Sequence, residues 1–362
     1  MTPLRSPTKG AGGGKSDLRR DCRMGCPFGV VAPGALLGGL AFANLVYIAL
    51  QFFPQPLSML GGENMEFGFL MNSSEVTFGD ITIAPLSNYN EVVQQFYEKA
   101  SVANGWIYPP LKRVAQNFNE KKRFSKDGPE VPATHYYLSP THSIHSQNID
   151  TDDEHLRFLI LCYGFLHGFY LLKDQYSYFM KTPYVRGKLH SLMPSGKDLE
   201  SGMTTLNNLY QCCNEENRKR IFAIIHWFLV SGSYEMAWDH FDAQYKVLDG
   251  VYKYYSMQHR CKMIPHACRP ALLADVYGVQ LPKWAITSKD SKSQLSLIRN
   301  GLTHEAFFAG EPIGYSYPKE NFRLELTNFN MKLICGVLGL RTPYLFIAPE
   351  DRQMHTWNLP PV

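Results

Sequence analysis

The chain has 362 residues, of which 45% are hydrophobic and 13% aromatic, and its formal net charge at pH 7 is +4. Residues 1–27 carry six basic and two acidic side chains, which account for the whole charge excess. Residues 28–362 therefore have no net charge. This excludes a global basic field of the kind that attracts nucleic acids, so any RNA must be held by a local patch. The length allows two domains, or one large and one small domain.

Residues 1–64 are expected to be a leader that is separate from the folded part. Residues 1–27 are rich in Gly, Pro and Arg, which predicts disorder. Residues 28–53 contain no charge and are long enough to span a bilayer, and the arginines before them would hold the N-terminus in the cytoplasm. One interpretation is therefore a single-pass inner-membrane anchor through residues 28–53.

The other interpretation is that translation starts at Met65. Gly61-Gly62-Glu63-Asn64 can be encoded by a purine-rich ribosome-binding sequence that is followed closely by a start codon. Six of the eight cysteines come after the leader, and the adjacent pair Cys212-Cys213 is not typical of a disulfide framework. We therefore expect a cytoplasmic protein, with membrane contact only if residues 28–53 are translated.

Two regions are expected between the leader and residue 232. Residues 65–150 predict a mixed α+β region, and residues 151–232 predict a helical region with a sensing or regulatory role. The expected elements are strands over 65–71 and 75–83, a helix over 90–104, a loop over 121–141, and buried helices over 155–182 and 217–231.

Two segments contain histidines close together, as a metal site would require. His142 and His145 are three positions apart, but no carboxylate or third ligand follows at a spacing that is typical of metal sites. Residues 259–268 hold two histidines and two cysteines at a spacing that matches no familiar zinc site. We expect neither segment to bind a metal, and we expect no cofactor, because no phosphate-binding loop, dinucleotide fingerprint or hydrolase elbow is present.

The most specific feature of the chain is the hexapeptide Arg299-Asn300-Gly301-Leu302-Thr303-His304. A guanidinium and an imidazole that a helix holds together can grip a phosphate and move a proton, which is the minimum needed to cut RNA without a metal. Asn300 and His304 are four positions apart and should share one helical face. The opposite stripe should face the core, and it consists of Leu295, Ile298, Leu302 and Ala306.

The surroundings of the motif support a helix with an exposed functional face. Ser291 or Ser293 should cap its start, and Gly310 should end it. Three apolar residues surround His304 and indicate a protein–protein surface, namely Leu297, Phe307 and Phe308. A local basic patch for RNA could include Lys289, Lys292, Arg299 and Lys319. The plain alternative is that Arg299 pairs with Glu305 or a neighbouring acid and that His304 is an ordinary surface histidine.

Two further helices frame the motif. Residues 234–255 carry large apolar residues at spacings of three and four, which is typical of a helix packed in a bundle, and residues 322–340 indicate a mostly buried helix. This succession around the Arg-Asn-x-x-x-His helix resembles the HEPN superfamily over residues 234–342. More narrowly, it is similar to C-terminal HEPN domains of bacterial abortive-infection and antiphage proteins. The expected fold is mainly α, with a HEPN-like helical bundle over residues 233–345.

The resemblance implies a metal-independent endoribonuclease of the toxin or antiviral-defence type, active as a homodimer whose two motif helices face each other. His304 would assist proton transfer as a ribose 2′-hydroxyl attacks the adjacent phosphate. Arg299 would hold that phosphate, and Asn300 would orient His304 or contact the phosphate. Asp249 or Asp242 on the preceding helix would assist, and the product would be a 2′,3′-cyclic phosphate.

Partners follow from the same resemblance. RNA would be the substrate, and an antitoxin or a phage trigger would control the activity. The alternative is a non-catalytic HEPN-like helical module that binds a partner protein or a nucleic acid.

Overall fold

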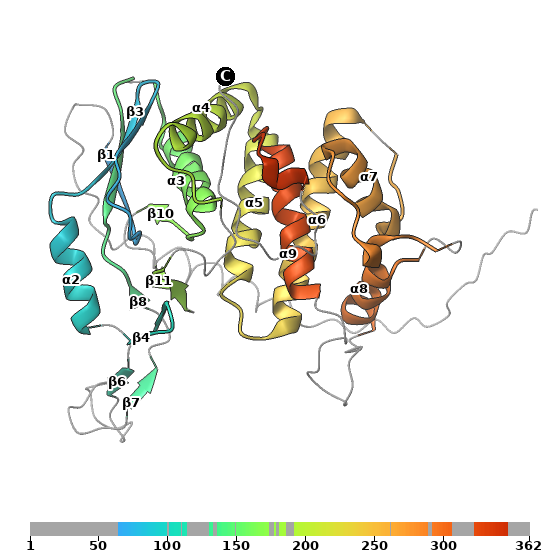
Figure 1. Ribbon diagram of the computed structural model, residues 1–362, viewed down its shortest axis with the longest axis horizontal. Helices are drawn as coiled ribbons and strands as arrows, with labels where there is room; N and C mark the ends of the chain where they lie inside the picture. Colours follow the sequence, from blue (N-terminus) through green and yellow to red (C-terminus); the bar gives the residue numbers. More distant parts are fainter. Residues whose placement is uncertain are drawn as a thin grey trace, which may run out of the picture. The chain divides into compact units, whose positions relative to one another are not determined.

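The computed structural model describes residues 64–99, 101–109, 111–113, 130–132, 136–148, 150–173, 177–178, 181–185, 192–260, 262–288, 292–305 and 322–346. These residues are mainly helical with small antiparallel sheets (Figure 1), so the mainly α prediction is confirmed. They belong to one unit, Met59–Val362.

Most of the predicted leader lies outside the described residues. This applies to the anchor over residues 28–53 and to every residue before Asn64. Within the described ranges, no helix combines the length and the apolar character that crossing a membrane requires.

The N-terminal region is built around an antiparallel sheet with the strand order β10-β1-β9-β3-β2. The strands are β1 (Asn64–Gly68), β2 (Val76–Phe78), β3 (Ile81–Pro85), β9 (His142–Ser146) and β10 (Leu172–Lys173). Burial alternates along β2 and β9, as expected for a sheet that covers the core with one face. The predicted single strand over 75–83 was wrong, because the chain turns at Gly79, whose φ of 62° suits glycine, and β2 pairs with β3.

The helix predicted over 90–104 is shorter than expected. It is α2 (Tyr89–Lys99), and β4 (Ser101–Ala103) begins shortly after it and pairs with β5 (Trp106–Tyr108). β5 also pairs with β12 (Thr182–Pro183). Two more strand pairs are β6 (Leu111–Arg113) with β7 (Glu130–Pro132), and β8 (Tyr136–Tyr137) with β11 (Ser177–Tyr178). The predicted loop over 121–141 therefore contains β7 and β8, and much of the remainder lies outside the described residues.

The long helix predicted over 155–182 was wrong beyond its first half. α3 (Asp153–His167) begins after Asp152, whose side chain accepts a hydrogen bond from the backbone N–H of His155. It ends at Gly168, which has a φ of 72° and returns the chain to β10. α4 (Gly196–Cys212) was not predicted, and α5 (Glu215–Ser231) agrees with the predicted helix over 217–231.

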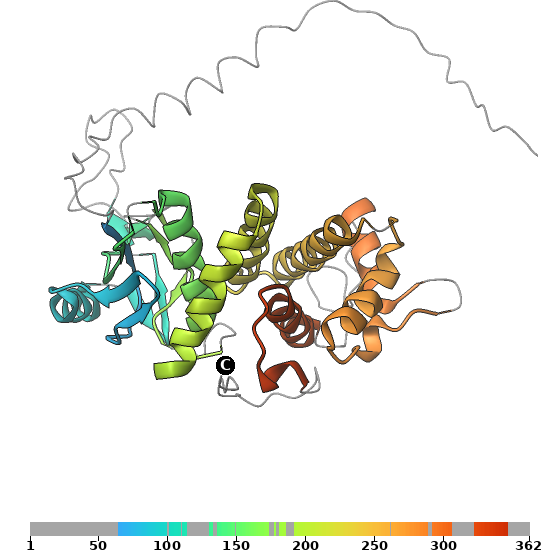
Figure 2. The ribbon, with the colours of Figure 1, turned by 90° about the horizontal axis from the view of Figure 1, so that it is seen from above.

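Three C-terminal helices were predicted from the sequence. α6 (Ala237–His259), α8 (Gln294–His304) and α9 (Phe322–Val337) correspond to the three predicted helices. The connection between α6 and α8 contains η1 (His266–Cys268), α7 (Arg269–Tyr277) and η2 (Lys283–Ala285), which were not predicted; η3 (Pro343–Phe346) follows α9. α6 packs against α5, α7 and α9, and Figures 1 and 2 both show α9 alongside it.

The aromatic seam predicted for α6 is buried except at its last residue, Tyr255, which is half-buried. Trp238, Phe241, Tyr245, Leu248 and Tyr252 are all buried in one core cluster that also contains residues of β1, α3, α5 and α9. The domain boundaries expected at 150/151 and 232/233 stay predictions.

Candidate functional site

The motif helix α8 is fixed at its start by a capping box. The Ser293 side chain accepts a hydrogen bond from the backbone N–H of Ser296 at 3.1 Å, and the Ser296 side chain accepts one from the backbone N–H of Ser293 at 2.9 Å. This confirms Ser293 as the cap. Leu295 and Ile298 are buried, which confirms the predicted core stripe at these positions. Leu302, the next residue of the stripe, is half-buried against the same core, whereas Asn300, Thr303 and His304 are exposed.

The end of α8 differs from the prediction. The helix stops at His304, where the backbone N–H of Glu305 closes the last turn on the carbonyl of Gly301, so the predicted end at Gly310 was wrong. Four residues used in the sequence argument lie outside the described ranges, namely Ala306, Phe307, Phe308 and Gly310. Leu297 is 54% exposed and provides an apolar group on the outer face.

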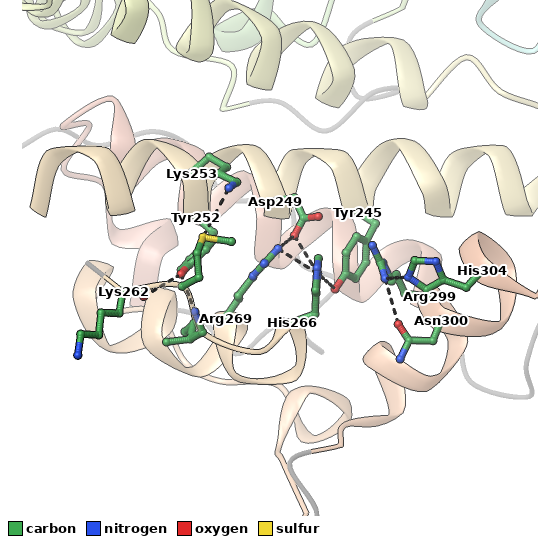
Figure 3. Close-up of polar contacts among 12 residues, drawn as sticks. Tyr245, Asp249, Tyr252, Lys253, Lys262, His266, Arg269, Arg299, Asn300 and His304 are labelled. Atoms are coloured by element: carbon green, nitrogen blue, oxygen red, sulfur yellow. Dashed lines mark hydrogen bonds and ion pairs between the residues drawn. The ribbon is translucent and has the colours of Figure 1, made fainter. Parts of the chain in front are cut away.

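Arg299, Asn300 and His304 are brought together as the motif predicts (Figure 3). Arg299 Nη1 donates to His304 Nε2 at 2.6 Å and to Asn300 Oδ1 at 3.1 Å. A guanidinium has only donors, so Nε2 accepts here and the imidazole in this contact is neutral. Asn300 and His304 are exposed and Arg299 is half-buried. Among the described residues Arg299 forms no salt bridge, so the expected plain alternative, a pair with Glu305, is not observed.

Tyr245 of α6 connects the motif to a second cluster. The Arg299 guanidinium lies 5.7 Å from the centre of the Tyr245 ring, within the range of a cation–π contact. The Tyr245 hydroxyl lies 3.2 Å from His266 Nδ1. Burial, and next the Asp249 carboxylate, raise the pKa of Tyr245. The hydroxyl therefore keeps its proton near neutral pH.

The second cluster consists of Asp249, His266 and Arg269. Arg269 is only 4% exposed, and its Nη1 lies 2.5 Å from Asp249 Oδ1 and 2.9 Å from His266 Nδ1. Asp249 Oδ1 is 3.4 Å from His266 Nδ1. The Arg269 guanidinium also covers the Tyr252 ring at 4.5 Å. Figure 3 shows these side chains in one row along α6 with the motif residues at the other end.

The charge balance around His266 favours a neutral imidazole. Burial lowers the pKa of His266 first; the Asp249 carboxylate raises it, and Arg269, Arg299 and His304 lower it. The Arg299 guanidinium of the motif is thus close enough to His266 to influence its protonation.

Asp249, predicted to assist catalysis, lies near the motif but does not contact it directly. Asp249 lies in the row, but it contacts Arg269 and His266, and it reaches Arg299 only through His266 and Tyr245. The other predicted acid, Asp242, pairs with Lys246 at 2.8 Å on the surface of α6.

Three residues of this site were not predicted as functional from the sequence. Tyr245 was expected only as a buried residue of its helix, His266 lies in a segment that was not expected to bind a metal, and no role was expected for Arg269. Two signals could have found them. Tyr245 and Asp249 are four positions apart and share a helical face. Arg269-Pro270 has the form of a helix start, which would have brought a short helix back toward α6.

A groove of about 600 Å³ runs beside the motif between α5, α6 and α8. Arg299 and Thr303 of α8 line it, and so does Trp227 of α5. Its basic lining residues are Lys219, Arg220, Lys246, Lys253 and Arg299, and its acidic ones are Glu216, Asp242 and Asp249. Of the predicted basic patch, Arg299 lines the groove, Lys292 does not, and Lys289 and Lys319 lie outside the described residues.

The histidine pair of β9 has no metal-binding geometry. His142 and His145 are three positions apart on a strand, so their side chains point to opposite faces. His142 is buried between Phe67 and the Asn72 carbonyl, which its Nε2 contacts at 2.6 Å, and burial lowers its pKa to about 4. In the part of the chain that the structure describes, no three His, Cys, Asp or Glu residues are grouped for a metal ion.

The row of side chains and the adjoining groove can bind a phosphate, through Arg299, and move protons, through two imidazoles.

Comparison of the chain with protein-family models, with curated proteins and with solved structures finds no match.

Proposed function

We propose that the chain is a metal-independent endoribonuclease of the HEPN type that cuts RNA at Arg299, Asn300 and His304. The observation that carries the proposal is the 2.6 Å contact between Arg299 Nη1 and His304 Nε2 at the exposed end of α8. This contact joins a phosphate-binding group to a neutral proton acceptor. The groove with five basic lining residues beside it supplies a path for an RNA backbone.

The chemistry follows from the two groups. A phosphate that pairs with Arg299 draws the guanidinium away from His304 and frees Nε2 as a proton acceptor. His304 then takes the proton of a ribose 2′-hydroxyl, whose oxygen attacks the adjacent phosphorus. Arg299 stabilises the charge that develops on the non-bridging oxygens, and Asn300 holds the guanidinium in position. The products are a 2′,3′-cyclic phosphate and a 5′-hydroxyl.

The proposal includes a homodimer and a role in toxin or antiphage defence in the cytoplasm. Both come from the resemblance to abortive-infection HEPN domains. The exposed Leu297 next to the motif supports a protein contact at this face. Two α8 helices facing each other would form one composite RNA site, whose activity is released by a phage trigger or by loss of an antitoxin. A chain that is strictly monomeric by light scattering, with and without RNA, would exclude the composite site.

The test compares the purified full chain with His304→Ala and Arg299→Ala on single-stranded RNA in the presence of EDTA. We expect wild type to form 2′,3′-cyclic ends and each variant to be slower by about 100-fold or more. The matched control is His145→Ala, a histidine of β9 outside the site. The same variants are compared in cells, where growth and tRNA and mRNA integrity are followed with and without phage challenge.

A non-catalytic module that binds RNA or a partner protein is the other outcome. In that case wild type and His304→Ala leave RNA intact to the same extent under every condition. RNA binding by both proteins would then assign the basic groove to recognition alone.

A further inference from the structure

The groove meets the motif helix at two side chains. Within α8, all of which the structure describes, Arg299 and Thr303 line the groove, whereas Asn300 and His304 do not. Arg299 and Thr303 are four positions apart, so they lie on one helical face about 6 Å apart along the axis. An RNA strand that follows the groove to Arg299 would therefore reach Thr303 as well.

The Arg299 guanidinium is engaged at one of its three nitrogens. Nη1 contacts His304 and Asn300, and Figure 3 shows both of these side chains turned toward the guanidinium. Nη2 and Nε form no hydrogen bond to any residue in the described ranges. These donors are open to a phosphate that approaches Arg299 through the groove.

The Thr303 hydroxyl is also open to a ligand. A threonine hydroxyl within a helix commonly bonds a carbonyl one turn earlier, as Thr204 and Thr205 of α4 do at 2.8 Å and 3.0 Å. Thr303 is exposed, and its Oγ1 makes no such bond to the described part of the chain. Its O–H is therefore a donor on the groove side of α8 without a partner in the same helix.

We infer that Thr303 is a second phosphate-binding residue of the site, and that its Oγ1 donates a hydrogen bond to a non-bridging oxygen of the phosphate that Arg299 holds. This inference rests on the proposed function. It adds that the scissile phosphate is bound from the groove side of α8, so the substrate is a strand that lies in the groove and is cut where α8 borders it.

The charges around this end of the groove suit a phosphate. Asp249 also lines the groove, but its carboxylate pairs with Arg269, which is only 4% exposed. Arg299 has no acidic partner among the described residues. A phosphate placed there meets one uncompensated cation and one neutral hydroxyl donor, and the groove continues past Lys253 for the rest of the strand.

The hydroxyl would act mainly on the transition state. As the 2′-oxygen attacks, negative charge grows on the non-bridging oxygens of the phosphate, and a hydrogen bond to one of them becomes stronger. Such a contact lowers the barrier more than it tightens substrate binding. No proton is transferred at Thr303, and His304 keeps the role that it has in the proposed function.

The test compares Thr303→Val and Thr303→Ser in the full chain on ordinary RNA. Valine keeps the branched shape of threonine without a donor, whereas serine keeps the donor. We expect Thr303→Val to lower kcat/KM by about 10-fold, mostly through kcat, and Thr303→Ser to stay near wild type. The matched control is Thr204→Val, whose hydroxyl bonds only the Glu200 carbonyl of its own helix, and it should cut as wild type does.

A second measurement tests for direct contact with the phosphate. The same RNA is prepared with sulfur in place of one or the other non-bridging oxygen at the cleaved linkage, because sulfur is a weak hydrogen-bond acceptor. One of these two stereoisomers should slow wild type and Thr303→Ser about 10-fold more than it slows Thr303→Val, which has already lost the contact.

The sulfur effect is a ratio of two rates on one protein sample, so a partly unfolded variant does not change it. Equal sulfur effects in wild type and Thr303→Val on both stereoisomers overturn the role of Thr303, and so does an unchanged kcat/KM of Thr303→Val on ordinary RNA. In both cases the ribonuclease proposal stands. A wild-type chain that cuts no RNA under any trigger overturns the proposed function and this inference with it.

Discussion

His142 illustrates at the scale of one residue how burial sets a charge state. It is fully buried, stacks on Phe67 with ring centres 5.6 Å apart, and contacts Thr141 Oγ1 and the Asn72 carbonyl. Burial lowers its pKa from 6.5 to about 4, so the unfolded chain takes up the proton first as the pH falls. The contribution of the neutral ring to stability is therefore complete above pH 6.5 and is lost as the pH falls toward 4.

We predict that wild type loses more stability on acidification than His142→Gln does. Between pH 7 and pH 4 the difference in the free energy of unfolding should reach roughly 3 kcal/mol. Urea unfolding at pH 7, 6, 5 and 4 measures it. Burial also lowers the pKa of His155 and of His226. Both residues are present in wild type and in the variant, so their contributions to the pH dependence cancel in the difference. Parallel pH profiles would contradict the prediction.

Residue patterns predicted the site only where it lies within one helix. Arg299, Asn300 and His304 are neighbours on α8, so helical spacing alone brings them together. His266 and Arg269 come from η1 and α7, and no periodicity in one element connects them to Asp249 on α6. Their meeting depends on how a connection full of prolines folds back, which is a tertiary result.

At the scale of elements, α8 presents the motif only if its first turn is formed. The hydroxyls of Ser293 and Ser296 are buried and satisfy each other's backbone N–H groups. We predict that Ser293→Ala costs about 1 kcal/mol in the free energy of unfolding. Amide hydrogen exchange in the first turn of α8 should also speed up, as mass spectrometry of a peptide covering residues 292–305 can measure.

The control is Ser256→Ala, since the Ser256 hydroxyl bonds only the Lys253 carbonyl of its own helix at 3.0 Å. This variant should leave α8 exchange unchanged. If Ser293→Ala leaves stability and exchange as in wild type, the capping box does not hold the motif helix.

The elements that were predicted close to their observed bounds are the apolar helices. α5, α6 and α9 are rich in apolar residues and largely buried. The two largest errors both occurred at glycines: Gly79 turns one expected strand into a hairpin, and Gly168 ends α3 where the apolar sequence continues. The apolar run after Gly168 forms part of the sheet, which residue composition cannot distinguish from a buried helix. α4 was missed although its buried residues Leu199, Met203, Leu206 and Tyr210 recur at spacings of three and four.

At the scale of the whole molecule, a chain without a global basic field still has a basic groove. The groove combines side chains from α5, α6 and α8, which are far apart in sequence. Three of its five basic residues are already paired: Lys219 with Glu215, Arg220 with Glu216 at 3.7 Å and Lys246 with Asp242 at 2.8 Å. Lys253 and Arg299 form no salt bridge with any residue in the described ranges. These two are therefore the cations most available to phosphates.

This arrangement predicts the salt dependence of RNA binding. In the His304→Ala background, which leaves the RNA uncut, we expect Lys253→Ala to weaken binding of every RNA sequence to a similar degree. The slope of log affinity against log salt should become shallower by about 0.7, the contribution of one phosphate contact on a single strand. Fluorescence anisotropy over a range of salt concentrations measures both quantities. The matched control is Lys197→Ala, an exposed lysine of α4 that does not line the groove, and it should leave the slope unchanged. Equal slopes for Lys253→Ala and Lys197→Ala would mean that RNA does not follow the groove between α5 and α6.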